Sequence, residues 1–539
     1  MMISTDALEI SLVSDPRRSE EDLATRVVED EEEMYGIDPV LERRLRRKLD
    51  RRLITLVFAA YLFAFLDRSN IGNAQTAGMG NDLGFGDEKY QWLLTIFYIP
   101  YSRQMLAQVH FLFEWFAIMW KLVPPHIWAG VTVLTWGLAS TLQAVATNWE
   151  GLMVCRWFLA MAEAGFGPGV PYLLSFFYRR HELGFRCGIF LSAAPLATTF
   201  AGALAYGITS AHTPLTNWRL LFLVEGIPTL LLAIALYFLL PDSPASVSFL
   251  TPAEKRVASA RAILQSGTPD SSSRLGALSL SEALAAFRSP QTWIQPLMYF
   301  SCNVSFASLP VFLPAILAGM GYSSVNAQGL TAPPYFFAFV VCLVTTYLAD
   351  RTQQRGLVII TLSLVAGVGY LLLAVEHSLP IRYFGVFLAA GGVFPAIANI
   401  LSWVLNNQGT DTKRGVAIAM LNIIGQCGPL LGTRMFPVGE GPYYTKGMAV
   451  CAGFMFFNAL LAVCLRAWFV RENKRLVREE RECDGSKGKG AVAGEGEMEG
   501  GGKGLSVVVE GAVAGGKGEG EGVIGASEME GGWGYRYVL

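Results

Sequence analysis

Four ionisable side chains lie inside stretches of sequence that are otherwise apolar. Asp67 and Arg68 stand side by side at the end of "LITLVFAAYLFAFL", and Arg156 and Glu163 lie within "EGLMVCRWFLAMAEAGFG". A charged side chain at the centre of a bilayer costs roughly 2.5–3.5 kcal/mol even on the lenient insertion scale, so it normally faces a cavity or a partner. These four residues are therefore the first candidates for chemistry.

The spacing of the four residues favours pairing between helices. Arg156 and Glu163 are seven residues apart, so on a helix they share one face about 10 Å apart, too far for direct neutralisation. Asp67 and Arg68 project about 100° apart and do not face each other. We expect Arg68 or Asp67 to meet Glu163 or Arg156. The alternatives are a static charge cluster that locks two helices together, or a pair that snorkels at the membrane edge.

This set of residue types suits transport coupled to protons. A carboxylate beside an arginine stays ionised until that arginine is displaced. An incoming anion would compete for Arg68 and would release Asp67 or Glu163 to hold a proton. Anion binding and protonation would then favour each other, as symport requires.

The composition places these residues in a membrane protein. Of the 539 residues, 52% are hydrophobic and 16% are charged, whereas soluble chains are about a quarter charged. The net charge of −2 gives no indication of nucleic acid as a partner. The eight cysteines show no CxxC or Cys/His spacing, so neither a disulfide framework nor a metal site is expected.

An enzyme is not expected either. The sequence contains no Walker-type glycine loop, metal-ligand cluster or nucleophile arrangement, so no catalytic residues and no cofactor are predicted, and ATP-driven transport is disfavoured. A proton gradient is the expected energy source.

Long apolar runs predict an all-α membrane protein with twelve transmembrane helices. A spanning helix needs about 20 predominantly apolar residues, and runs that are continuously apolar rather than alternating exclude a closed barrel. The predicted spans lie at approximately residues 53–73, 91–121, 124–146, 151–178, 187–210, 219–240, 292–318, 329–349, 356–376, 383–406, 414–436 and 447–469.

The charges of the loops predict the orientation of the chain. Loops such as "ATNWE" and "AGMGYSSVNAQ" lack Lys and Arg, whereas the alternate set, such as "YRRHELGFR" and "RENKRLVREER", is basic. Because positive residues stay on the cytoplasmic side, both termini are expected in the cytoplasm. The expected units are an N-terminal tail, a six-helix half, a cytoplasmic central loop, a second six-helix half and a largely disordered tail rich in Gly, Glu and Lys after about residue 484, at residues 1–52, 53–240, 241–290, 291–470 and 471–539.

Three motifs resemble those of a known family. "DRSNIGNA" closes the first span, "CRWFLAMAEAGFGPGVPYLLSFFYRRHE" forms the fourth, and "WRLLFLVEGIPT" opens the sixth. Together they resemble the major facilitator superfamily, and more closely the fungal allantoate and nicotinate permeases of its anion:cation symporter family. The similarity runs from about residue 50 to 475.

The resemblance implies roles for seven residues. A substrate carboxylate would bind Arg68, protons would be carried by Asp67 and Glu163, and Arg156 would support Glu163 from the same helix. Further cavity-lining positions, for which a packing role is the alternative, would be Tyr101, Trp403 and Asn422. The resemblance also implies a monomer in the plasma membrane that imports a small carboxylate such as allantoate or nicotinate, with protons, substrate and lipid bilayer as partners.

One stretch departs from the family pattern. Family members run from "FYIPY" almost directly into a "LFE" segment, whereas here "SRQMLAQVH" (102–110) intervenes. Without these nine residues, 91–101 and 111–121 would join into a helix of ordinary length, 22 residues. We hypothesise a retained intron in the gene model, which a transcript lacking this stretch would confirm and its uniform inclusion would refute.

Two other functions are compatible with the sequence. A transport-inactive relative could sense a nutrient through the same cavity, which the inserted stretch slightly favours and uptake by the intact chain would exclude. An uncoupled uniporter or exporter is disfavoured by Asp67 and Glu163, and uptake independent of external pH would revive it.

Overall fold

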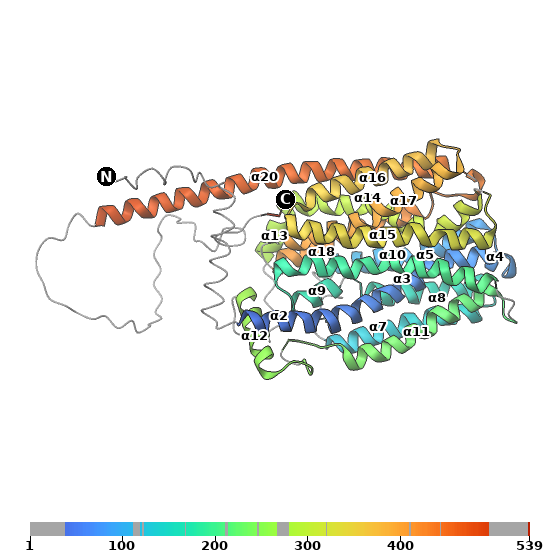
Figure 1. Cartoon of the computed structure of the whole chain (residues 1–539), viewed down its shortest axis with the longest axis horizontal. Coiled ribbons are helices and arrows are strands. Elements are labelled where there is room, and N and C mark those ends of the chain that lie inside the picture. The colour runs from blue at the N-terminus through green and yellow to red at the C-terminus, as the bar shows by residue number, and fades with distance from the viewer. Residues whose placement is uncertain are drawn as a thin grey trace, which may run out of the picture.

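The fold consists of helices packed side by side. The computed structural model describes residues 38–110, 119–120, 123–167, 169–210, 214–244, 247–266, 280–319, 321–408, 411–441, 443–494 and 537–538, and these contain no β-strand. The long helices run along the long axis of the molecule (Figure 1).

The chain forms a first set of helices that carries the four ionisable residues. In chain order these are α2 (Pro39–Leu49), a π-helical turn (Asp50–Ile54), α3 (Thr55–Thr76), α4 (Met79–Asp82), α5 (Asp87–His110), α7 (Pro125–Leu142), a 3-10 turn (Gln143–Val145), α8 (Trp149–Ala164), α9 (Gly169–Ser175), α10 (Arg180–Ser210) and α11 (Asn217–Leu239).

A second set follows. It comprises α12 (Pro252–Ser266), α13 (Leu280–Arg288), α14 (Gln291–Gly319), α15 (Ser324–Thr352), α16 (Arg355–Val375), α17 (Leu379–Asn406), α18 (Asp411–Gly425), α19 (Cys427–Gly432), a 3-10 turn (Val438–Glu440) and α20 (Thr445–Gly494).

Within the described residues, the predicted spans fall on helices, and two of them are broken. The segment 151–178 contains α8 and α9, and 414–436 contains α18 and α19, because glycine and proline interrupt both runs. Eight helices of the described residues are long and apolar enough to cross a membrane. The count of twelve therefore stays a prediction.

The two sets of helices pack closely against each other. In the interface, α10 packs against α15 and α17, and α3 packs against α14. The approach of α3 to α14 requires Gly72, because a Cβ atom there would lie 2.6 Å from the carbonyl oxygen of Val311. A residue with a side chain at position 72 would push these helices apart at the level of the site.

Contacts between the two sets close one end of the bundle. We call the end that carries α2, α12 and α13 the basic end and the opposite end, near α4, the far end (Figure 1). Toward the far end, the hydroxyls of Thr95 and Thr433 lie 3.4 Å apart, and Arg434 Nε donates to Thr95 Oγ1 at 3.2 Å. Nearby, Thr209 Oγ1 donates to Gln328 Oε1 at 2.9 Å.

Further contacts close the basic end. The backbone N–H of Phe185 donates to Asp350 Oδ2 at 3.0 Å, and Ser402 Oγ donates to the carbonyl oxygen of Gly184 at 3.0 Å. Asp350 also pairs with Arg355. The first and second sets of helices are thus bonded to each other at both ends.

Segments expected to be loop or tail are partly helical. Residues 39–49 form α2, and two helices, α12 and α13, lie in the segment 241–290. The expectation of a disordered tail after residue 484 is corrected up to Gly494, where α20 ends. Glu472, Arg475 and Glu479 form (i, i+3) and (i, i+4) ion pairs that favour continuation of the helix past the apolar part. Residues 495–536 lie outside the described part of the chain.

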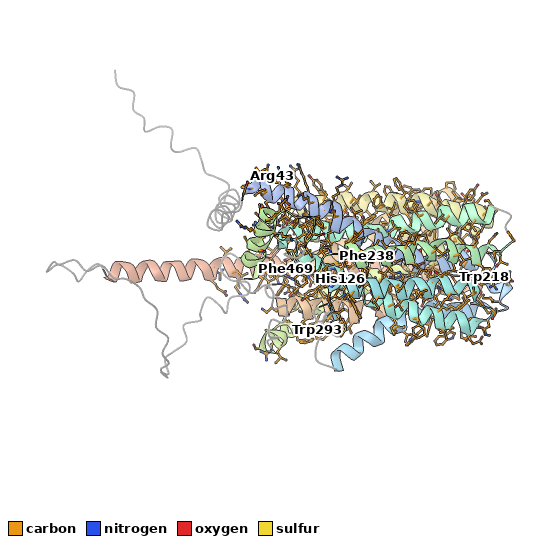
Figure 2. The ribbon with its side chains drawn as sticks, turned by 90° about the horizontal axis from the view of Figure 1, so that it is seen from below. Arg43, His126, Trp218, Phe238, Trp293 and Phe469 are labelled. Carbon is orange, nitrogen blue, oxygen red and sulfur yellow. The ribbon has the colours of Figure 1, made fainter. Side chains whose placement is uncertain are left out.

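The inserted stretch 102–110 is helical and extends α5. The helix runs from Asp87 to His110 without a break, despite Pro100 in its interior. Figure 2 shows the light-blue end of this helix standing apart from the bundle. Residues 111–118, which would complete the predicted second span, lie outside the described residues.

Glu254 connects α12 to α2 at the basic end. Its carboxylate accepts from the backbone N–H of Thr251 at 2.9 Å, and the Thr251 hydroxyl accepts from the Glu254 N–H at 3.3 Å, which together form a capping box. Lys48 Nζ donates to the same carboxylate at 2.8 Å. Burial alone would raise the pKa of Glu254, but the hydrogen bonds from Lys48 and Thr251 outweigh it and hold that pKa below its usual value.

We predict that Glu254→Ala destabilises the protein by about 1 kcal/mol, the usual magnitude of a lost helix cap. The comparison is thermal unfolding of the purified protein against Arg256→Ala, an exposed position on the same helix. Because the pKa is lowered in the folded state, the stabilisation is present above the unfolded value of 4.5 and is lost as the pH falls through the lower folded value. Equal melting temperatures for wild type and Glu254→Ala at neutral pH would contradict the assignment.

Candidate functional site

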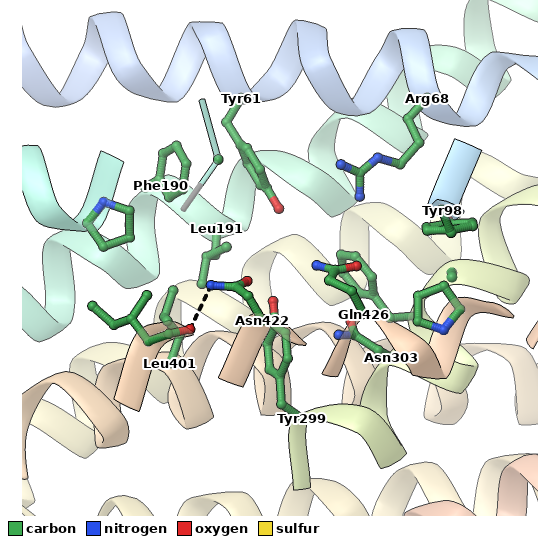
Figure 3. A pocket seen from close by; sticks show the side chains of 16 residues that line it. Tyr61, Arg68, Tyr98, Phe190, Leu191, Tyr299, Asn303, Leu401, Asn422 and Gln426 are labelled. Atoms are coloured by element: carbon green, nitrogen blue, oxygen red, sulfur yellow. Dashed lines mark hydrogen bonds between the residues drawn. The ribbon is translucent and has the colours of Figure 1, made fainter. Parts of the chain in front are cut away.

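A cavity lies between the two sets of helices at the level of Arg68. Its volume is about 60 Å³, which corresponds to roughly five water molecules. Figure 3 shows Arg68 and Tyr61 pointing into it from α3, opposite Asn422, Gln426, Asn303 and Tyr299. The full lining consists of Tyr61, Arg68, Tyr98, Gly167, Pro171, Phe190, Leu191, Tyr299, Asn303, Phe306, Ala307, Leu401, Ile418, Asn422, Gln426 and Pro429.

Arg68 and Glu163 form an ion pair in the wall of the cavity. Arg68 Nη2 donates to Glu163 Oε1, which joins α3 to α8. The side chain of Glu163 is 3% exposed and that of Arg68 is 14% exposed. The predicted pairing between these two helices is confirmed in this form, with the arginine facing the cavity and the carboxylate behind it.

Phe97 of α5 lies beside two guanidinium groups. The guanidinium carbon of Arg68 is 5.1 Å from the ring centroid of Phe97, and that of Arg156 is 5.0 Å from it. Such cation–π contacts are worth more when the cation is desolvated. The ring therefore holds both arginines near the cavity without adding a negative charge.

Arg156 supports the pair from behind. It is buried, and its two terminal nitrogens donate to the backbone carbonyl oxygen of Arg68 at 3.4 and 3.5 Å. Arg156 is not part of the cavity lining. Its contact with the backbone of α3 fixes the position of Arg68.

Asp67 lies on another face of α3 from the cavity. Its two carboxylate oxygens accept from Ser140 Oγ of α7 at 2.6 Å and from Thr229 Oγ1 of α11 at 3.0 Å. Asp67 is 1% exposed and is absent from the cavity lining. The structure therefore places Asp67 outside the cavity lining, although Glu163 and Arg156 still act on it electrostatically.

The three further cavity-lining positions that the resemblance implies lie in different surroundings. Asn422 lines the cavity, and its side-chain N–H donates to the carbonyl oxygen of Ile418 on its own helix at 2.9 Å. Trp403 is buried outside the lining, where its Nε1 donates to the carbonyl oxygen of Val538 at 2.7 Å. Tyr101 falls in α5, and its side chain lies outside the described part of the structure.

Most of the polar lining was not predicted from the sequence. Tyr61 lies two turns before Arg68 on the same face of α3, and this spacing could have revealed it. Two further pairs have (i, i+4) spacing within apolar helices, Tyr299 with Asn303 and Asn422 with Gln426. Tyr98 gave no comparable signal, because its neighbours in α5 are aromatic and apolar as well.

The lining can bind an anion with an apolar body. Among the described lining residues, Arg68 carries the charge, and hydroxyl and carboxamide groups surround it. Aromatic rings complete the walls, with the rings of Tyr61 and Phe190 4.4 Å apart. A guanidinium with several neutral hydrogen-bonding groups is suited to a carboxylate.

A bundle of membrane-type helices with a polar cavity between two sets of helices defines a membrane transporter. The chain belongs to the Major Facilitator Superfamily, whose family model matches residues 57–433. Its relatives are transporters and not enzymes.

Two relatives show how far the similarity extends. An uncharacterized transporter of Schizosaccharomyces pombe is 33% identical over 452 residues, which cover 82% of this chain and 86% of that protein. A high-affinity nicotinic acid transporter of Saccharomyces cerevisiae is 28% identical over 436 residues, which cover 81% of this chain and 79% of that protein.

A solved structure shows the same fold at much lower identity. A bacterial homologue of the human lysosomal transporter Spinster, in an inward-facing and occupied conformation, superposes with a TM-score of 0.54 and 15% identity. The match covers 78% of this chain and 97% of that chain.

We predict that Asn422→Ala and Trp403→Phe act differently on substrate binding. Asn422→Ala removes a polar group from the cavity and should raise the KM for the transported substrate about fivefold, equivalent to about 1 kcal/mol for one hydrogen bond. Trp403→Phe should leave the KM unchanged, because the indole lies outside the lining. The measurement is uptake kinetics of both variants at matched surface levels. If Trp403→Phe raised the KM and Asn422→Ala did not, the placement of Asn422 in the lining and of Trp403 outside it would be contradicted.

Proposed function

We propose that this transporter imports a small organic carboxylate together with protons. The observation that carries the proposal is the Arg68–Glu163 ion pair in the wall of the cavity. Arg68 faces the cavity and is therefore available to a ligand, but it is also bonded to the buried carboxylate of Glu163.

The ion pair provides a means of coupling. A substrate carboxylate that binds Arg68 competes with Glu163 for the same guanidinium. Glu163, 3% exposed, would then be a buried carboxylate with a weakened partner, and taking up a proton removes that cost. Asp67, adjacent to Arg68 on α3, is the second proposed proton carrier.

The lining favours a flat, aromatic acid over a large or strongly polar one. Tyr61, Phe190, Tyr299 and Phe306 supply ring surfaces around a space of about 60 Å³. The nicotinic acid transporter of Saccharomyces cerevisiae, one of the relatives, makes nicotinate the first compound to test. Allantoate and similar small acids are the next candidates.

The remaining features of the proposal follow from the family plan. Twelve spanning helices in two six-helix halves would alternate in opening the far end and the basic end around the cavity. The basic end would face the cytoplasm, in accord with its Lys and Arg residues. We propose a monomer in the plasma membrane.

A transport-inactive nutrient sensor is the second candidate. Helix α5 extends to His110, beyond the position where family members begin the next segment, which favours this candidate. The C-terminal end of α5 also stands apart from the bundle (Figure 2). Comparing the full chain with a chain that lacks residues 102–110 distinguishes the two candidates.

We predict acid-stimulated uptake of nicotinate that depends on Arg68. Radiolabelled nicotinate and allantoate are supplied to permease-deficient yeast at external pH 5 and 7, with the full chain and with the chain lacking residues 102–110. Arg68→Ala should abolish uptake, because it removes the cationic group of the lining and leaves Glu163 buried without this partner.

Surface level is the control for folding, and Arg68→Lys keeps the charge while losing the planar fork of donors. Uptake that is equal at both pH values would contradict proton coupling, and full activity of Arg68→Ala would contradict the binding site. If the shortened chain takes up substrate and the full chain does not, residues 102–110 are inactivating.

A further inference from the structure

Glu225 is a buried acid to which neither the sequence motifs nor the cavity assigns a role. It lies in α11, is 1% exposed, and does not line the cavity. Neither of its carboxylate oxygens has a hydrogen-bond partner among the described residues. An unpartnered buried carboxylate is costly, so its presence calls for a cause.

Glu225 lies one helical turn from the site of Asp67. The hydroxyl of Thr229, four residues further along α11, lies 3.1 Å from the carbonyl oxygen of Glu225 and 3.0 Å from Asp67 Oδ2 and shares its one proton between them. Residues four apart share a helix face, so the two acids lie on the same interface of α3 with α11. Asp67 also acts electrostatically on Glu225.

Two further buried polar groups lie at the level of Glu225. Asn70 is one turn beyond Asp67 on α3, and Gln143 is one turn beyond Ser140 at the end of α7. Both are fully buried, and both amide groups lack partners among the described residues. Three buried polar side chains without partners among the described residues, from α3, α11 and the turn after α7, thus each lie about one helical turn along the chain from a residue of the Asp67 site.

The surroundings do not compensate a negative charge on Glu225. On α3 the ionisable neighbour is Asp67, and α7 contributes Ser140 and Gln143, which are neutral. Arg156 and Glu163 of α8 act on Asp67, whereas Asp67 is the charged group of the described residues that acts on Glu225. Asp67 accepts from two described hydroxyl groups, whereas no described donor reaches the Glu225 carboxylate, so the two buried acids cannot both be ionised at acceptable cost.

We propose that Glu225 is a proton-binding residue and forms with Asp67 a carboxyl pair that holds one proton behind α3. In this conformation the proton resides on Glu225, and Asp67 is the ionised partner whose two oxygens accept from Ser140 and Thr229. The pair is separate from the Arg68–Glu163 pair at the cavity. Because Asp67 and Arg68 are adjacent on one helix, a shift of α3 on substrate binding changes the distance between the two acids and hence their hold on the proton.

The first experiment needs no substrate. The infrared carbonyl-stretch band of protonated carboxyl groups is recorded at neutral pH for purified wild type, Glu225→Gln and Glu150→Gln, an exposed acid at the start of α8. A band that is lost in Glu225→Gln and kept in Glu150→Gln supports the proton on Glu225. An identical band in all three proteins would overturn the proposal.

The second experiment rests on the proposed function and tests the role of this proton in the transport cycle. In vesicles with a gradient of two pH units, one coupled proton supports up to about 100-fold accumulation of nicotinate. Glu225→Gln, which mimics the protonated acid, should lose most of this accumulation while exchange of external for internal nicotinate continues. Glu225→Asp, which keeps an ionisable group, should retain part of it.

The outcomes separate the two proposals. Wild-type accumulation in a Glu225→Gln protein that lacks the infrared band would make Glu225 a permanently protonated packing residue and overturn its role in the cycle. Loss of exchange together with accumulation, at normal surface level and melting temperature, would also overturn it. If wild type itself moves no nicotinate, the proposed substrate fails, and the infrared comparison still decides the proton site.

A second inference concerns Tyr537 and Val538, which occupy a site on the second set of helices. Asn407 exchanges two hydrogen bonds with Val538, at 2.7 and 3.1 Å, and Asn473 exchanges two with Tyr537, at 2.9 and 3.0 Å. The Tyr537 ring stacks on Phe469 at 4.8 Å and 20°. Phe469 lies toward the end of the bundle from which α20 projects (Figure 2).

We infer that this docked segment restrains the basic end. It bonds Trp403 and Asn407 at the end of α17 to Asn473 of α20. Ser402, next to Trp403, holds the carbonyl oxygen of Gly184 in the first set of helices, a contact that must break before the basic end opens. The segment therefore acts as a strap that slows opening.

Hydrogen exchange and uptake test the strap. Asn473→Ala removes the two hydrogen bonds to the backbone of Tyr537, and Tyr537→Ala removes the ring that stacks on Phe469. Each variant should speed exchange at the end of α17 and raise the initial uptake rate about twofold or more, because part of the lost interaction is felt in the opening step. Arg475→Ala, an exposed position on α20 paired with Glu472 and Glu479, is the matched control. Unchanged exchange in both variants, or a fall in uptake at normal surface level, would overturn the inference.

Discussion

The cost of placing charge in an apolar interior organises the first set of helices. Arg68 and Glu163 could not both be buried without each other, because removing one partner of a buried ion pair typically costs about 3–5 kcal/mol. The pair fixes α3 against α8, while Phe97 and Arg156 hold the guanidinium from two further directions. The arginine that faces the cavity is thus positioned by groups that a substrate does not touch.

Helix α3 carries ionisable side chains on two different faces. One face carries Arg68 into the cavity, and the other buries Asp67 against α7 and α11. Two adjacent residues therefore belong to two different sites. Since a helix moves as a rigid element, a change at one site is transmitted to the other without an intervening network of side chains.

The sequence predicted the parts of this arrangement that follow from the energetic cost of burying charge and from the helical period of about 3.6 residues. Charged residues in apolar runs pointed to Arg68, Asp67, Arg156 and Glu163, and the need for a partner pointed to pairing between α3 and α8. It could not predict whether Arg68 or Asp67 meets α8, because neighbours about 100° apart on a helix contact different elements. Only the packing of α7, α8 and α11 decides between them.

The placement of Trp403 and Glu225 depended on tertiary structure in the same way. An indole in an apolar helix has the same sequence signature whether it lines a cavity or receives the distant Val538, 135 residues further along the chain. Glu225 belongs to the motif "WRLLFLVEGIPT", but the motif does not show why the residue matters. Its surroundings are an acid on α3 and neutral amide and hydroxyl groups, and none of the described groups that act on it is a basic side chain. Nor did composition indicate that α20 would continue to Gly494.

The relative strengths of the contacts account for how such a molecule can move. The ends of the bundle are joined by hydrogen bonds such as Thr95 with Arg434 and Ser402 with Gly184, each worth about 0.5–1.5 kcal/mol. The buried Arg68–Glu163 pair is several times costlier to disrupt. In the proposed transport cycle, either end would open by exchanging weak hydrogen bonds for water, whereas the central pair would change only when another anion or a proton replaces what is lost. A transporter needs that order of strengths, with weak closures at both ends around a strong central interaction that responds to its ligands.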